Sequence, residues 1–245
     1  MRTFGLIGKS LSHSFSQQYF VEKFLQNNVR DAEYRLFSLA AIKEVKVLLK
    51  HPTLLGFNVT IPYKSEIIPF LDGLDKVAQE VGAVNCVVKQ NNQWVGYNTD
   101  VVGFERMLQK AEDRRQKAAL VLGSGGASKS VCYVLKQKNI PFQIVSRKKT
   151  DETIIYSDVT ENIINHYSLV INTTPLGMFP LTDKMPQIPY PTLTGEHTLI
   201  DLIYNPEETL FLKEGKKRNA FIINGLTMFE VQAEESGRLF LPNTF

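Results

Sequence analysis

Residues 118–139 read AALVLGSGGASKSVCYVLKQKN, which is an apolar run, a glycine-rich turn and a helix-like segment in direct succession. A second strand-like run, FQIVSRKKT, follows at residues 142–150, within the ~30 residues that a βαβ unit spans. Two strands joined in this way lie parallel in one sheet. No other segment constrains the fold of this chain as strongly.

Strand-like and helix-like runs alternate along the rest of the chain, which is typical of an α/β fold with a mainly parallel sheet. The expected strands are residues 3–8, 33–39 and 56–62, together with 169–178 and 198–206, which have loops at their carboxyl ends. The expected helices are 14–26, 42–50, 100–111 and 224–240. Residues 83–98 predict a hairpin that turns at Asn91-Asn92. Residues 179–196, with four prolines, are expected to form a mobile loop.

The composition excludes several classes of protein. A chain of 245 residues with 43% hydrophobic residues can bury a sizeable core, and a formal charge of +3 is too small to favour nucleic acid. No apolar run reaches the ~18 residues of a membrane helix, and the N-terminus lacks the pattern of a signal peptide. Cys86 and Cys132 have apolar neighbours, which favours buried free thiols over a disulfide. We therefore expect a cytoplasmic monomer or homodimer without nucleic-acid or membrane partners.

The turn of the βαβ unit has the features of a phosphate-binding loop and consists of Gly123, Ser124, Gly125, Gly126 and Ala127. Glycines let the backbone approach a pyrophosphate, and the N–H groups at a helix start favour negative charge. Ser128 replaces the usual third glycine, so the pattern is a variant of the dinucleotide fingerprint. Its βαβ context favours a ligand over a plain tight turn.

The end of the second strand indicates which dinucleotide is bound. An NAD site normally has Asp or Glu there, hydrogen-bonded to the ribose 2′-hydroxyl. Here the sequence is Ser146, Arg147 and Lys148, with no acid before Asp151. A guanidinium binds a 2′-phosphate through paired, charge-assisted bonds, whereas an acid would repel it. NADP(H) is therefore the expected cofactor, and a solvated surface turn is the alternative.

Seven motifs occur in the order in which shikimate dehydrogenases carry them, and the chain resembles that family over nearly its whole length. They are SHSFS (12–16), NVTIPYK (58–64), GAVNCV (82–87), YNTDVVGF (97–104), GSGGAS (123–128), INTTPLGM (171–178) and GLTMFEVQA (225–233). The resemblance implies NADPH-dependent, reversible reduction of 3-dehydroshikimate to shikimate on the pathway to chorismate and the aromatic amino acids. We expect two α/β domains: a discontinuous substrate domain, 1–100 plus 225–245, and a Rossmann-like NADP-binding domain, 101–224, with the active site in the cleft between them.

The same resemblance implies roles for individual residues. Lys64 corresponds to the catalytic lysine, and Asp100 to its partner at the substrate hydroxyls. Ser14 and Ser16 would hold the substrate carboxylate, and His13 beside them is interpreted as structural. The ring hydroxyls and the pocket wall would be contacted by Thr60, Asn85, Gln232 and Tyr204. Further cofactor contacts, at the nicotinamide among others, would be made by Thr173, Leu202 and Gly225.

The residue types suit this chemistry independently. Hydride arriving at a ketone carbon leaves an alkoxide, which needs a nearby positive charge and then a proton. The four histidines are scattered and no cluster has zinc-site spacing, which argues against a metal as the electrophile. Desolvation alone would favour the neutral amine of Lys64, whereas a neighbouring carboxylate from Asp100 favours the ammonium. Which of the two groups loses its proton first stays open.

Other interpretations remain at this stage. Lys64 could be an exposed lysine, Ser14 and Ser16 plain helix-start serines, and Gln232 a surface residue. Asp100 could cap a helix, which is compatible with catalysis. The rival functions are a quinate/shikimate dehydrogenase that uses NAD or both cofactors, and a non-catalytic metabolite sensor. A methylenetetrahydrofolate dehydrogenase of similar architecture lacks support from the SHSFS motif.

Overall fold

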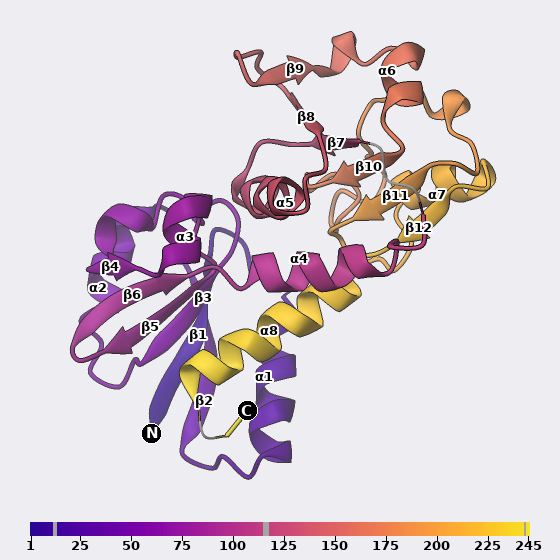
Figure 1. The fold of residues 1–245 in the computed structure, drawn as a ribbon. Helices are drawn as coiled ribbons and strands as arrows, with labels where there is room; N and C mark the ends of the chain where they lie inside the picture. The colour runs from indigo at the N-terminus through magenta and orange to yellow at the C-terminus, as the bar shows by residue number, and fades with distance from the viewer. Residues whose placement is uncertain (12–13, 115–117, 243) are drawn as a thin grey trace. The chain divides into compact units, whose positions relative to one another are not determined.

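The computed structural model describes residues 1–11, 14–114, 118–242 and 244–245, and the chain divides into two compact units (Figure 1). One unit comprises Met1–Asp100 and Val231–Phe245, and the other comprises Val101–Glu230. Each contains one six-stranded sheet with helices packed on it, so the predicted α/β class is confirmed. In the described parts of the chain, no helix is both long and apolar enough to cross a bilayer.

The sheet of the first unit is mixed and has the order β2-β1-β3-β5-β6-β4. Its strands are β1 (Arg2–Gly8), β2 (Ala32–Ser38), β3 (Gly56–Val59), β4 (Gly73–Leu74), β5 (Cys86–Gln90) and β6 (Gln93–Tyr97). β1 pairs parallel with β2 and β3, whereas β5 runs antiparallel to both of its neighbours. The predicted hairpin is confirmed, because β5 and β6 are joined by Asn91 and Asn92 with φ of 50° and 64°.

Helices cover both faces of this sheet. They are α1 (Ser16–Gln26), η1 (Ile42–Glu44), α2 (Val45–Leu48), η2 (Ile68–Phe70), α3 (Lys76–Val81) and the C-terminal part of α8 (Leu226–Phe240). Phe20 of α1 stacks on Tyr34 of β2, with ring centroids 4.4 Å apart, and α8 packs into the same aromatic core through Phe240. The expected continuous helix over 42–50 is wrong, since a 3₁₀ turn precedes one short α-turn there. β-branched residues such as Val45 and Val47 weaken helical preference.

The sheet of the second unit is entirely parallel and has the order β12-β11-β10-β7-β8-β9. Its strands are β7 (Ala119–Leu122), β8 (Phe142–Ser146), β9 (Thr153–Ile155), β10 (Leu169–Asn172), β11 (Thr198–Asp201) and β12 (Phe221–Ile223). From β7 the chain moves first to β8 and later to β10 on the other side. This reversal is a topological switch point, where α/β sheets bind ligands beyond the carboxyl ends of the strands.

Both faces of the parallel sheet are covered. The helices are α4 (Asp100–Gln109), α5 (Gly126–Gln137), η3 (Tyr156–Asp158), α6 (Glu161–His166), η4 (Tyr190–Thr192), α7 (Leu210–Lys217) and the first turns of α8. One hydrophobic core contains Phe104 and Val131, and the other contains Ile164 and Phe211. Every residue of β7, β10 and β11 is buried, as expected for a parallel sheet between helical layers.

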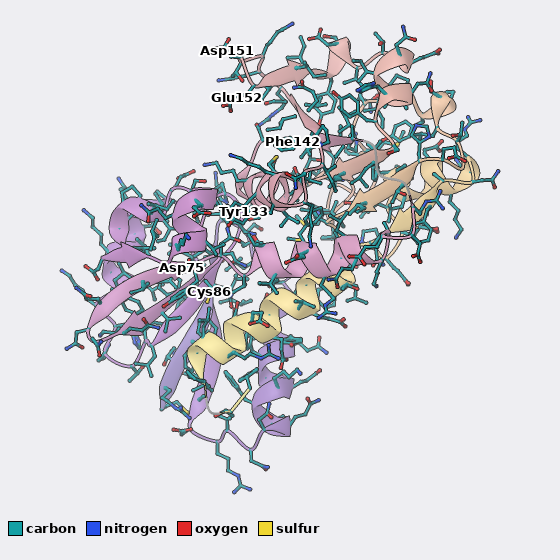
Figure 2. All side chains as sticks on the ribbon, viewed as in Figure 1. Asp75, Cys86, Tyr133, Phe142, Asp151 and Glu152 are labelled. Carbon is teal, nitrogen blue, oxygen red and sulfur yellow. The ribbon has the colours of Figure 1, made fainter. Side chains whose placement is uncertain are left out.

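Neither cysteine forms a disulfide. Cys86, labelled in Figure 2, is buried in the first unit, and burial raises the pKa of its thiol to about 12. Cys132 on α5 is half-buried, which corrects the expectation of full burial, and the same cause raises its pKa to about 11. Both thiols are therefore protonated and unreactive near neutral pH.

Candidate active site

The first unit brings Lys64 and Asp100 into direct contact, with Nζ 2.6 Å from Oδ2. The exposed fractions of the two side chains are only 14% and 5%. Lys64 follows β3 in a turn that is held from both sides, because the Tyr63 hydroxyl donates to the Leu39 carbonyl and the Val84 N–H donates to the Lys64 carbonyl. Each charge is thus largely removed from water and compensated by the other.

Asn85 determines how the Asp100 carboxylate is oriented. The backbone N–H of Thr99 donates to Asn85 Oδ1 over 2.7 Å, so the amide oxygen must face Thr99 and the NH₂ group must face the other way. That NH₂ group donates to Asp100 Oδ1 over 2.9 Å. The carboxylate therefore has one oxygen on Asn85 and the other on Lys64.

Gln232 and two hydroxyl groups complete the cluster from α8 and from the end of β6. The side-chain oxygen of Gln232, a half-buried residue, accepts from Asn85 over 3.3 Å, so Gln232 contacts the cluster. The hydroxyls of Thr99 and Ser236 both donate to the Gln232 main-chain carbonyl, over 3.0 and 2.8 Å. These bonds connect the helix to the lysine–aspartate pair.

A buried polar layer lies behind this cluster. Asn58 of β3 donates to the Ser236 hydroxyl over 2.8 Å and to the Asn85 carbonyl over 3.2 Å. Its own oxygen accepts from the Tyr34 hydroxyl over 2.8 Å. Asn58, Thr99 and Ser236 were not among the residues predicted for the site. Ser236 could have been found from its spacing, because it lies four residues after Gln232 and hence on the same face of the helix.

This arrangement can donate a proton to an oxygen that gains negative charge. The described residues occupy one of the three N–H bonds of the Lys64 ammonium, which leaves two for an incoming oxygen. The Asp100 carboxylate compensates the Lys64 charge in a site that is largely shielded from water. An alkoxide beside Lys64 would meet both a positive charge and a proton source.

Three further predicted residues lie in neighbouring segments of the same unit. Ser16 is the first residue of α1, and its backbone N–H donates to the Ser14 hydroxyl over 3.2 Å. Thr60 comes directly after β3, and its N–H donates to the Ile7 carbonyl. His13 and Ser12 lie outside the described residues. Ser14 and Ser16 thus flank a helix start, where N–H groups and hydroxyls favour an anion.

In the second unit, the glycine turn depends on close backbone approaches that only glycine allows. Gly123 has φ of +113°, and a Cβ there would lie 2.6 Å from the Thr173 hydroxyl oxygen. Gly125 is the N-cap of α5 and has no side chain that could cover the first N–H groups of the helix. A Cβ on Gly225 would lie 2.1 Å from the Leu202 carbonyl oxygen. Four predicted cofactor residues, Gly123, Thr173, Leu202 and Gly225, therefore lie at the carboxyl ends of β7, β10 and β11 or against them.

The end of β8 carries exposed cations. Arg147 and Lys148 are exposed, whereas Lys149 forms an ion pair with Asp158 at 3.1 Å. The Ser146 hydroxyl lies 3.0 Å from that of Ser124, which connects this strand end to the glycine turn. The first acids, Asp151 and Glu152, lie in the turn before β9 (Figure 2). The exposed Arg147 and Lys148 have the charge that would bind a phosphorylated ribose beside the glycine turn.

Comparison with known proteins identifies the family. Residues 6–87, which include Lys64 and Asn85, match the sequence profile of the shikimate dehydrogenase substrate binding domain. The NADP(+) shikimate dehydrogenase of Methanosphaera stadtmanae is 34% identical, over 98% of this chain and 91% of its own. The chain belongs to the shikimate dehydrogenase family.

Solved structures of the family have the same fold. Shikimate dehydrogenase 1 of Peptoclostridium difficile is 33% identical, with a TM-score of 0.89 over 100% of this chain and 93% of its own. The Thermus thermophilus enzyme, solved in complex with NADP(H) and shikimate, is 26% identical, with a TM-score of 0.83 over 100% of this chain and 95% of its own.

Tyr204, which the family resemblance assigned to the substrate pocket, lies in the second unit. Its ring stacks on Phe229 with centroids 4.5 Å apart, and burial raises the pKa of its hydroxyl to about 12. The hydroxyl is therefore protonated at neutral pH. In its own unit, Tyr204 follows β11 in the segment that also contains Leu202.

Proposed function

We propose that this chain catalyses the reversible, NADP-dependent interconversion of 3-dehydroshikimate and shikimate, on the way to chorismate. The observation that carries the proposal is the 2.6 Å contact between Lys64 and Asp100, oriented by Asn85. In a member of the shikimate dehydrogenase family, this pair supplies the charge and the proton that carbonyl reduction needs. We place the reaction in the cytoplasm, where two unpaired thiols are stable.

The two units take different parts in this proposal. The first unit, with Lys64, Asp100 and Asn85, binds the substrate. The second unit binds NADP(H) through its glycine turn, residues 123–127, with Arg147 and Lys148 on the 2′-phosphate. Support for the second assignment is the positive φ of Gly123, which allows a tight turn, and the uncovered helix start at Gly125, where N–H groups favour a pyrophosphate.

The substrate contacts follow from the polar groups of the first unit. The substrate carboxylate binds the hydroxyls of Ser14 and Ser16 at the start of α1. The ring hydroxyls are bound by Thr60, Asn85 and Gln232, whose side chains can donate and accept hydrogen bonds. Asp100 accepts from a ring hydroxyl while it keeps Lys64 charged.

Proton transfer is the contribution of Lys64. When bound, NADPH supplies the hydride that reduces the ketone carbon. As the carbonyl oxygen gains negative charge, the Lys64 ammonium donates a proton to it, and the resulting amine recovers a proton from water. In the oxidative direction, the neutral amine accepts the hydroxyl proton. Asp100 stabilises the ammonium in both directions and orients it.

The test is the absorbance of reduced nicotinamide, followed with purified protein, shikimate or quinate, and NADP⁺ or NAD⁺ in turn. We expect turnover with shikimate and NADP⁺, with kcat/KM far higher for NADP⁺ than for NAD⁺. Near-equal values for the two cofactors, or a preference for quinate, would favour the quinate/shikimate rival. Binding of shikimate without turnover would favour the metabolite sensor.

A further inference from the structure

Asp201 is a buried carboxylate that the proposed mechanism does not use. It ends β11, and none of its surface is exposed. Its partners are all neutral donors: the Asn172 amide at 3.1 Å, the Ile203 N–H at 3.1 Å and the Thr209 hydroxyl at 2.6 Å. Burial raises the pKa of this carboxyl to about 6 in spite of these bonds. Burial of a carboxylate among neutral partners costs free energy, so we expect the hydrogen bonds of Asp201 to have a role in the surrounding structure.

The bond to Asn172 determines which way the Asn172 amide faces. Asn172 ends β10 and is the register partner of Asp201 on the neighbouring strand. An ionised carboxylate can only accept, so the Asn172 NH₂ group must face Asp201. Asn172 Oδ1 then faces the chain ahead, where it accepts from the N–H and the hydroxyl of Thr174 over 3.0 and 2.7 Å.

These bonds hold the loop that follows β10. The Asn172 NH₂ group also donates to the Leu176 carbonyl over 3.2 Å, and the Leu176 N–H donates to the Thr174 hydroxyl over 3.2 Å. Residues 173–176 are therefore tied back to the end of their own strand. If Asn172 were reversed, its amide oxygen would face the Asp201 carboxylate and its NH₂ group would face the Thr174 N–H.

The loop held in this way lies against the glycine turn. Thr173 donates to the Leu122 carbonyl at the end of β7, over 2.8 Å, and its hydroxyl oxygen fills the space where a Cβ of Gly123 would be. β7 and β10 are the two strands of the topological switch point. Thr173 thus contacts both the end of β7 and the first glycine of the turn.

The other contacts of Asp201 act on the loop that follows β11. The Ile203 N–H donates to Oδ1, and Thr209 on Oδ2 is the N-cap of α7. Leu202, which lies between Asp201 and Ile203, is one of the residues expected at the cofactor. One carboxylate therefore restrains both loops at this edge of the sheet.

We propose that Asp201 is a positioning residue for dinucleotide binding, which holds residues 173–176 in place through the amide of Asn172. This inference rests on the proposed use of NADP(H) by the second unit. It assigns Asp201 no contact with substrate or cofactor and no part in proton transfer.

The test measures dissociation constants for NADPH and for shikimate separately, by isothermal titration calorimetry, on the full chain. We expect Asp201→Ala to weaken NADPH binding by about tenfold or more and shikimate binding by less than about twofold, since the carboxylate bonds that restrain the loops after β10 and β11 are lost. Thr174→Val, at a half-buried position, keeps the fold and removes one hydroxyl from the same loop, so a loss of about three- to tenfold is expected.

Two variants separate positioning from plain stability. Asp201→Asn keeps an oxygen for Asn172 and Ile203, and the Thr209 hydroxyl can turn to accept from its NH₂ group, so NADPH binding within about threefold of wild type is expected. His197→Ala is the matched control at the opposite end of β11. His197 is 5% exposed, and its ring makes three hydrogen bonds, to Thr194 and to the Ile164 carbonyl. It should lower the melting temperature without weakening NADPH binding.

Hydrogen exchange in the absence of ligand gives a readout independent of binding. In Asp201→Ala, the backbone N–H groups of Thr173, Thr174, Leu176, Gly177 and Met178 should exchange faster than in wild type, while those of β7 change little. If Asp201→Ala does not fold, Thr174→Val decides. The inference is overturned if the folded Ala and Val variants bind NADPH within twofold of wild type, or if Asp201→Asn weakens binding as much as Asp201→Ala. Failure of wild type itself to bind NADPH would instead overturn the proposed function.

Discussion

At the scale of single residues, the contact between Lys64 and Asp100 depends on a third side chain. The two charged residues are 36 positions apart in the sequence, and Asn85 decides which carboxylate oxygen remains for the lysine. The amide of Asn85 is itself set by a backbone N–H of Thr99. A largely buried lysine such as Lys64 is therefore costly only until its partner is in place, because a paired charge loses much less free energy in leaving water than an isolated one.

Arg147 is the residue at which cofactor choice can be tested most simply. We expect Arg147→Ala to raise the KM for NADPH by about tenfold or more and that for NADH by less than about twofold, because only NADPH carries the 2′-phosphate. Steady-state kinetics with both cofactors measure this. Lys149→Ala is the matched control, since Lys149 is engaged by Asp158, and its effect should be smaller. An equal change for both cofactors after Arg147→Ala would refute the phosphate contact.

The resemblance to shikimate dehydrogenases was sufficient to select Lys64, Asp100, Asn85 and Gln232, and the structure brings these four together. Their functional roles stay predictions. The pairing of Asn58 with Tyr34 could not be predicted in this way, because the bond between them joins two strands that are not neighbours in the sheet. The sequence shows that a polar residue inside a buried strand needs a hydrogen-bond partner. Which residue becomes that partner depends on how the strands and helices pack in the folded protein.

At the scale of secondary-structure elements, long periodic segments were predicted well and short ones were missed. The βαβ unit β7–α5–β8 and the hairpin β5–β6 are confirmed, because each combines apolar periodicity with its own turn residues. The strands β4, β9 and β12 have only two or three residues, and α3, α6 and α7 have six to eight. Such segments are too short to show a period, and tertiary packing decides their conformation.

The buried polar layer gives a prediction for the way α8 joins the sheet. We expect Ser236→Ala to destabilise the protein by about 1–2 kcal/mol and to raise the KM for shikimate several-fold, because Asn58 loses its acceptor and the Gln232 carbonyl loses a donor. Chemical denaturation and steady-state kinetics measure the two effects.

Thr3→Val is the matched control for this variant. It removes a fully buried hydroxyl that contacts Glu33 and Thr53 at the other end of the same sheet. It should destabilise the protein without changing the KM for shikimate. A Ser236→Ala enzyme that loses stability but keeps its KM would show that the layer is structural only.

At the scale of the whole molecule, burial of Asp201 links the stability of the fold to pH. Its pKa is raised from the ordinary 3.8 to about 6, so the folded state holds this proton at pH values where the unfolded state has lost it. The contribution of Asp201 to the free energy of unfolding therefore falls as pH rises from about 4 to about 6, by roughly 3 kcal/mol in total, and stays low above that range.

Asp201→Asn removes this titration. The measurement is therefore chemical denaturation of wild type and of the Asp201→Asn variant at several pH values. The free energy of unfolding of wild type minus that of the variant should decrease between about pH 4 and pH 7. The difference cancels the contributions of other carboxyls to the pH dependence. One of these is Glu234, whose pKa the Lys23 ammonium lowers, so that its contribution to stability rises with pH. A difference that is constant or increases with pH would contradict the burial argument.

The central claim is that the Lys64 ammonium stabilises and protonates the oxygen formed by hydride transfer, and replacing that lysine tests it most directly. Turnover of 3-dehydroshikimate with NADPH should be compared for wild type, Lys64→Ala and the control Lys89→Ala, in which the lost ammonium lies over Trp94 of the same unit. We predict that Lys64→Ala lowers kcat by about 10³-fold or more with little change in substrate affinity, because general acid catalysis is worth roughly 10²–10⁴-fold. Lys89→Ala should leave kcat unchanged. Turnover like that of wild type in Lys64→Ala would contradict the account.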